Sequence, residues 1–79
     1  MNLEEIKARL TTALGECEIQ LHGEGNHLSI TAIGDIFAGK RQVQRQQQVY
    51  ALLAEDIADG SVHAVNMKLY TPEEWQAAD

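Results

Sequence analysis

The sequence is short of the residues that small proteins use for covalent cross-links, because its 79 residues include a single cysteine, Cys17. One cysteine excludes an internal disulfide, and this absence is typical of a protein from a reducing compartment. No apolar run approaches the roughly 18 residues of a membrane span, and the acidic N-terminus is unlike a signal or transit peptide. We therefore expect a single small cytoplasmic domain over residues 1–79, with no membrane partner.

Basic residues are also scarce, since six Lys and Arg stand against twelve Asp and Glu and give a formal net charge of −6. Nucleic-acid binding depends largely on basic side chains beside phosphates, so this composition disfavours DNA as a ligand. The chain also has no Walker loop, no GxGxxG, no Cys-x-x-Cys and no Ser/His/Asp arrangement. These absences predict a protein that is not an enzyme and that binds another protein or a small ligand.

The hydrophobic periodicity predicts six elements in the order helix, strand, strand, helix, strand, helix. Their expected ranges are 2–14, 17–22, 28–33, about 40–58, 62–69, and a short helix that begins with Thr71-Pro72-Glu73-Glu74 as a capping box. In the long helix the expected core-facing positions are Val43, Gln47, Tyr50, Leu53 or Ala54, and Ile57, with Val49 and Leu52 beside them.

The long helix between two strands favours a right-handed crossover, and therefore parallel pairing of the second and third strands. The turn at 23–26 favours an antiparallel hairpin of the first two strands. The fold class is accordingly α+β, with order α-β-β-α-β-α and a three-stranded mixed sheet covered on one face by helices.

Three histidines are the main candidates for chemistry. His27 opens the second strand and His63 the third, so both lie at the same end of a parallel pair, and His22 closes the first strand. Two imidazoles at one end of a sheet fit a soft-metal or cluster site whose other ligands come from a partner chain. For each histidine the alternative is an ordinary solvated side chain or one satisfied within the core.

The basic side chains Lys40, Arg41 and Arg45 cluster at one end of the long helix, and Lys68 is expected nearby. They are either a solvated helix face or a surface for phosphates or an acidic partner. Cys17 begins an inward strand face, where a small buried side chain is expected rather than a thiolate ligand.

Several motifs, in their order and spacing, resemble the BolA family: Phe-Ala-Gly-Lys at 37–40, Val-Gln-Arg-Gln-Gln-Gln-Val-Tyr at 43–50, Val-His-Ala-Val at 62–65 and Tyr-Thr-Pro-Glu-Glu-Trp at 70–75. The short hairpin and the glutamines at 46 and 47 resemble its acid-stress-linked, IbaG-type branch. The resemblance implies a BolA-like fold, which is similar to a class II KH domain.

The resemblance also implies a heterodimer with a monothiol, CGFS-type glutaredoxin that shares a 2Fe–2S cluster, bound in part by glutathione. The family's C-terminal histidine falls on His63, and the second ligand falls on His27, with His22 as its substitute. We therefore expect a non-enzymatic adaptor in iron–sulfur cluster assembly, trafficking or iron sensing. A homodimer is a further option for the free protein.

The alternative that the family implies is a KH-like, DNA-binding transcriptional regulator linked to the stress response. It would use Lys40, Arg41, Arg45 and Lys68. Against it, a KH clamp needs a Gly-x-x-Gly loop, which is missing at the expected place, since Gly34 and Gly39 are too far apart.

Overall fold

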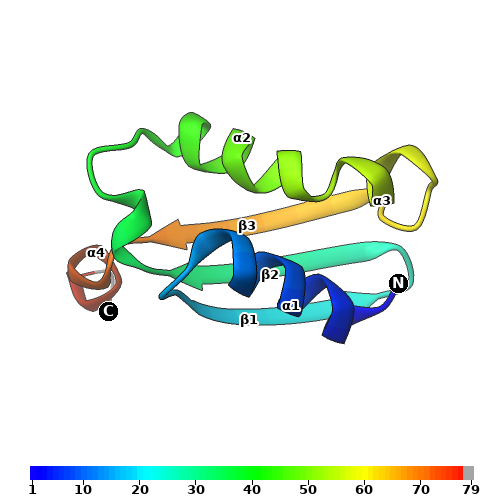
Figure 1. The fold of residues 1–79 in the computed structure, drawn as a ribbon, viewed down its shortest axis with the longest axis horizontal. Coiled ribbons are helices and arrows are strands. Elements are labelled where there is room, and N and C mark those ends of the chain that lie inside the picture. Colours follow the sequence, from blue (N-terminus) through cyan, green and yellow to red (C-terminus); the bar gives the residue numbers. More distant parts are fainter. Residues whose placement is uncertain (78–79) are drawn as a thin grey trace.

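A computed structural model describes residues 1–77 and contains the predicted elements in the predicted order (Figure 1). They are α1 (Leu3–Leu14), β1 (Glu18–Glu24), β2 (His27–Ile33), a 3-10 turn η1 (Asp35–Phe37), α2 (Gln42–Leu52), α3 (Ala54–Ala58), β3 (Ala64–Tyr70) and α4 (Pro72–Ala77). The α+β class is confirmed. In this part of the chain, no helix is both long enough and apolar enough to cross a membrane.

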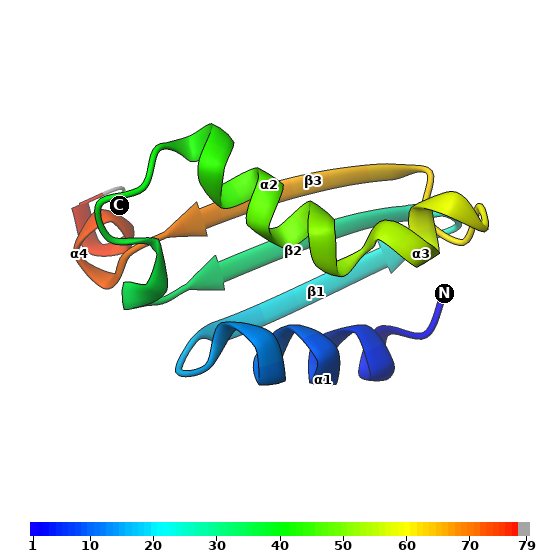
Figure 2. The same cartoon turned by 45° about the horizontal axis from the view of Figure 1, so that its top comes forward.

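The sheet has the strand order β1-β2-β3. Strands β1 and β2 form an antiparallel hairpin in which Glu24 pairs with His27, and β2 and β3 run parallel, with His27 paired to Ala64. Figure 2 shows α1 and α2 on one face of this sheet, which leaves the other face open. Both the parallel pairing and the one-sided cover were expected from the sequence.

The core lies between the sheet and these helices. Alternate residues of β2 (Leu28, Ile30 and Ala32) are buried on the helix side, because successive strand residues point to opposite faces. They meet a helical stripe from α1 at spacings of four, together with buried side chains from the rest of the chain: Ile6, Leu10, Leu14, Ile19, Phe37, Val49, Leu53, Val62 and Leu69.

The long helix predicted over about 40–58 is in fact two helices, since the backbone at Leu53 (φ −107°, ψ 6°) leaves the helical conformation between α2 and α3. The predicted core-facing stripe is correct at Leu53, with Val49 beside it, and wrong at its other positions. Val43, Tyr50 and Ile57 are 55%, 42% and 41% exposed. The buried residues of this segment are Arg45, Val49 and Leu53, of which only Arg45 was not expected near the core.

The observed inward face of α2 differs from the predicted one because a charged residue is buried. Periodicity assigns a charged residue to the solvent side, whereas Arg45 points inward and is only 4% exposed. With Arg45 inside, Val43 and Tyr50 turn toward solvent.

Candidate metal centre

The two histidines at the start of β2 and β3 are brought together by the main chain. Because His27 is paired with Ala64, its neighbour His63 lies beside the hairpin turn. The His63 N–H donates a 2.8 Å hydrogen bond to the carbonyl oxygen of Asn26, and the Ala64 N–H lies 3.4 Å from the same oxygen. The register therefore places His27 and His63 at one end of the sheet.

The two histidines hold different backbone positions at this end of the sheet. His27 is the first residue of β2 and is paired with Ala64, whereas His63 precedes β3 and follows the buried Val62. The His63 ring lies against the turn after α3, where Nε2 is 3.8 Å from the position that a Cβ on Gly60 would occupy. Both histidines are exposed. A group held by both would sit over the end of the two strands, in reach of a second molecule.

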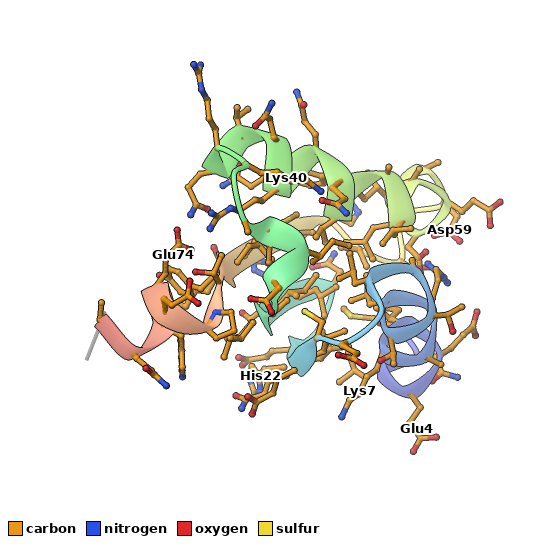
Figure 3. The ribbon with its side chains drawn as sticks, turned by 60° about the vertical axis from the view of Figure 1, so that its left-hand side comes forward. Glu4, Lys7, His22, Lys40, Asp59 and Glu74 are labelled. Atoms are coloured by element: carbon orange, nitrogen blue, oxygen red, sulfur yellow. The ribbon has the colours of Figure 1, made fainter. Side chains whose placement is uncertain are left out.

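His22 lies farther from this end. It is paired with Ser29 on the open face, and the diagonal relation to His27 corresponds to about 7–8 Å between Cα atoms. Figure 3 shows His22 on the side of the sheet away from α2. It shares the open face with His27, but it lies on β1, so that β2 separates it from His63 at the start of β3.

No metal site is complete within residues 1–77, because no three His, Cys, Asp or Glu side chains there are grouped closely enough to hold an ion. Imidazole nitrogens suit iron, and two of them can replace two cysteines on one iron of a 2Fe–2S centre. The donor set therefore fits such a cluster only if a second molecule supplies further ligands.

Cys17 is not one of the available ligands. It precedes β1, whose first residue Glu18 is paired with Ile33, the last residue of β2, so the thiol lies at the opposite end of the sheet from His27. The side chain is half-buried, and this burial raises the pKa of the Cys17 thiol. Both facts agree with its expected role as a small packed side chain.

Arg45 does not belong to a surface cluster of cations, and its assignment to a phosphate-binding face is corrected. Its Nη1 donates to the Leu69 carbonyl oxygen (2.9 Å) and to Glu74 Oε1 (2.6 Å), and its Nη2 donates to Glu74 Oε2 (3.1 Å). Its Nε donates to the carbonyl oxygen of Lys40 (3.0 Å). These bonds use four of the five N–H donors of Arg45, and the side chain is buried, so it is not available to a phosphate in solution.

The other three cations are dispersed. Lys40 precedes α2, and its Nζ donates to Gln48 Oε1 (3.0 Å). Its neighbour Arg41 is exposed. Lys68 stands on the open face of β3, because it pairs with Thr31 and lies two positions from Asn66. Lys40 and Arg41 therefore lie beside α2, on the helix side of the sheet, whereas Lys68 lies on the open face.

Glu74 is a residue whose structural role the sequence revealed only in part. The capping box correctly predicted its contact with Thr71, whose N–H donates to Glu74 Oε1 (2.8 Å) while Thr71 Oγ1 accepts from the Glu74 N–H (3.2 Å). Its ion pair with Arg45 spans α2 and α4 and has no local signal in the sequence.

Comparison of the sequence and the fold with known proteins identifies a family. The family model described as BolA-like protein matches residues 5–74. The chain belongs to the BolA family. As a BolA-family protein it is 44% identical over 75 residues to the acid stress protein IbaG of Escherichia coli K12, a match covering 95% of this chain and 89% of that relative.

Two further relatives differ in what their names report. The protein named DNA-binding transcriptional regulator BolA of Haemophilus influenzae is 39% identical over 66 residues, covering 78% of this chain and 63% of that protein. The solved structure of BolA1 from Arabidopsis thaliana superposes with a TM-score of 0.81 at 24% identity, covering 90% of this chain and 92% of that chain. The latter establishes that the fold is BolA-like.

Proposed function

We propose that this BolA-family protein is a non-enzymatic adaptor of the cytoplasm that shares a 2Fe–2S cluster with a monothiol glutaredoxin and glutathione. In the proposed complex, His63 and His27 are the ligands on this chain. The role of the complex would be iron–sulfur cluster assembly, trafficking or iron sensing.

The observation that carries the proposal is the placement of the two imidazoles. His27 and His63 are exposed at one end of adjacent parallel strands. The His63 N–H donates to the carbonyl oxygen of Asn26, the residue that precedes His27. Within residues 1–77 they have no third protein ligand nearby. Two nitrogen donors without a complete site are what a shared cluster requires from one of its partners.

The test is anaerobic reconstitution of iron and sulfide with this protein, a monothiol glutaredoxin and glutathione, followed by visible absorption and circular dichroism. The spectrum should differ from that of the glutaredoxin alone, and His63→Ala should abolish the difference. Cys17→Ser is the matched control, because the thiol lies at the other end of the sheet, and it should leave the spectrum unchanged. Far-UV circular dichroism checks that each variant folds. A His63→Ala spectrum equal to that of the unmodified pair would refute the assignment.

The competing function, DNA binding by the basic side chains, has less support. Arg45 is buried against Glu74, the remaining cations lie on two sides of the molecule, and the formal net charge is −6. The name of the Haemophilus influenzae relative is the main argument in its favour.

A further inference from the structure

The segment that leads into His63 is held at both of its ends by main-chain hydrogen bonds. The carbonyl oxygen of Asp56 on α3 accepts the Val62 N–H (3.1 Å), and the His63 N–H donates to the carbonyl oxygen of Asn26 (2.8 Å). Between these bonds the chain turns through Gly60, whose φ of 83° lies in the left-handed region that favours glycine. The position of His63 therefore depends on where α3 places the carbonyl of Asp56.

Helix α3 has little of its own to hold it in place. It is five residues long and none of them is buried, and a helix of this length is not stable alone. The buried Leu53 fixes its first end, where the backbone also leaves the course of α2. Asp56 is the least exposed residue of α3, with a side chain that is 16% exposed. The contacts of Asp56 therefore decide how firmly the rest of α3 is held.

The partner of Asp56 is Arg9 on α1. Arg9 Nη1 donates to Asp56 Oδ1 (2.6 Å) and also to the carbonyl oxygen of Leu52 (3.0 Å). Leu52 ends α2, and the last four carbonyl groups of a helix have no partner within that helix. One guanidinium nitrogen thus joins the end of α2 to α3 across the break at Leu53, from a helix more than 40 positions earlier in the chain.

We propose that Arg9 and Asp56 are positioning residues for His63. Their ion pair holds α3, and the main-chain carbonyl of Asp56 in turn holds Val62, the residue before His63. They act through the main chain and not as ligands. The consequence for cluster binding rests on the proposed function, whereas the placement of His63 does not. Groups that orient a metal ligand from behind change metal affinity by about 10- to 100-fold when they are removed.

Asp56→Ala separates positioning from direct bonding. The variant loses the carboxylate but keeps the main-chain carbonyl that accepts the Val62 N–H, so any change at Val62 or His63 must come from the position of α3. Glu55→Ala is the matched control, because it removes an exposed acid from the same first turn and causes the same loss of favourable charge there. Asp56→Asn keeps an acceptor oxygen for Arg9 and should therefore lie between the wild-type protein and Asp56→Ala.

Amide hydrogen exchange of the free protein, followed by NMR without iron, is the first measurement. In Asp56→Ala the Val62 and His63 amides should exchange about tenfold faster, because a hydrogen bond to a charged group is lost. The amide of Ile30, a buried residue of the central strand, reports global unfolding and is the internal reference. Glu55→Ala should exchange as the wild-type protein does at all three amides.

Arg9→Ala tests the same bond from the other helix. It should accelerate exchange at Val62 and His63 as well, and the double variant Arg9→Ala, Asp56→Ala should exchange no faster than Arg9→Ala alone, because both substitutions remove one shared bond. Wild-type exchange at Val62 and His63 in Asp56→Ala would overturn the proposal. So would a double variant whose acceleration is the product of the two single effects. Far-UV circular dichroism verifies that each variant folds.

The second measurement follows the cluster in the reconstituted mixture with glutaredoxin and glutathione. With Asp56→Ala the visible circular dichroism should disappear about tenfold faster in the presence of an iron chelator than with Glu55→Ala. If His63→Ala abolishes the signal but Asp56→Ala keeps the wild-type rate, the proposed function stands and the positioning role in cluster binding is refuted. If the wild-type mixture forms no shared cluster, the proposed function fails, and the exchange rates still decide whether the ion pair positions His63.

Discussion

Arg45 and Glu74 form a bidentate ion pair that joins α2 to α4. The Nη1–Oε1 distance is 2.6 Å and the Nη2–Oε2 distance is 3.1 Å. The guanidinium also lies 5.8 Å from the centre of the Phe37 ring, so its charge is placed among core side chains. Glu74 at the same time accepts the N–H of Thr71 and thereby caps α4. One carboxylate therefore both begins the last helix and neutralises a cation in the core.

The first prediction concerns the stability that depends on this pair. Arg45→Ala should lower the free energy of unfolding by about 2 kcal/mol, because it removes a buried side chain together with its hydrogen bonds to Leu69, Lys40 and Glu74. Arg41→Ala is the control, because that side chain is exposed, and it should change the free energy by less than about 0.5 kcal/mol. Urea denaturation of the two variants measures the difference. Equal stabilities would contradict the buried position of Arg45.

The second prediction concerns acid. Arg45 beside Glu74, with help from the Thr71 N–H, lowers the pKa of this carboxyl from 4.5 to about 2. A carboxyl with a lowered pKa in the folded state contributes stability that is fully present above its unfolded pKa, and this stability is lost as the pH falls through the folded value. The stabilising effect of Glu74 should thus disappear between about pH 4.5 and 2.

Glu74→Gln isolates this effect, because the amide can still cap α4 but carries no charge. The difference in free energy of unfolding between the wild-type protein and this variant should be largest near pH 6 and should shrink toward pH 2. Glu73→Gln, at the exposed neighbouring position, should show no such trend. A difference that stays constant with pH would mean that the ion pair does not lower the pKa of Glu74.

The third prediction separates the two candidates for the second cluster ligand. His27→Ala should weaken or abolish the spectral change on mixing with glutaredoxin, because His27 shares the end of the sheet with His63. His22→Ala should have little effect, since His22 is paired farther along the strand with Ser29. The opposite ranking of the two variants would transfer the assignment to His22.

The fourth prediction addresses nucleic acid. Binding of duplex DNA in about 0.15 M salt should be undetectable, and the double variant Arg41→Glu, Lys68→Glu should behave as the wild-type protein does. Arg45 is unsuitable for this test, because reversing its charge would bury a carboxylate beside the carboxylate of Glu74. DNA binding that weakens steeply with salt and is lost in the double variant would favour the regulatory function. Fluorescence anisotropy with a labelled duplex is a suitable measurement.

The sequence predicted the parts of the fold that depend on near neighbours. Ile6, Leu10 and Leu14 lie four residues apart on one face of α1, and Asn2 caps the helix locally, because its Oδ1 accepts the Glu5 N–H (3.1 Å). The alternation of β2 and the capping box of α4 were equally local. Parallel pairing followed from the crossover rule, and it correctly placed His27 and His63 at one end of the sheet.

The features that the sequence did not reveal depend on contacts between distant residues. The orientation of α2 is set by Arg45, whose partner Glu74 lies 29 positions later in the chain. A periodicity analysis treats such a charge as exposed and rotates the helix accordingly. The start of β3 also differed from the prediction, because the strand begins at Ala64 rather than at Val62 and His63 therefore precedes it.

The packing of the N-terminal side chains on the hairpin bears on how the molecule can be labelled. A Cβ at Gly23 would lie 3.1 Å from Leu3 and 3.5 Å from the sulfur of Met1, so the chain begins against the hairpin that also carries His27. Helix α4 lies at the other end of the long axis (Figure 1). A fluorophore or affinity handle attached beyond α4 leaves the histidines accessible, whereas the same attachment before Met1 would stand beside them.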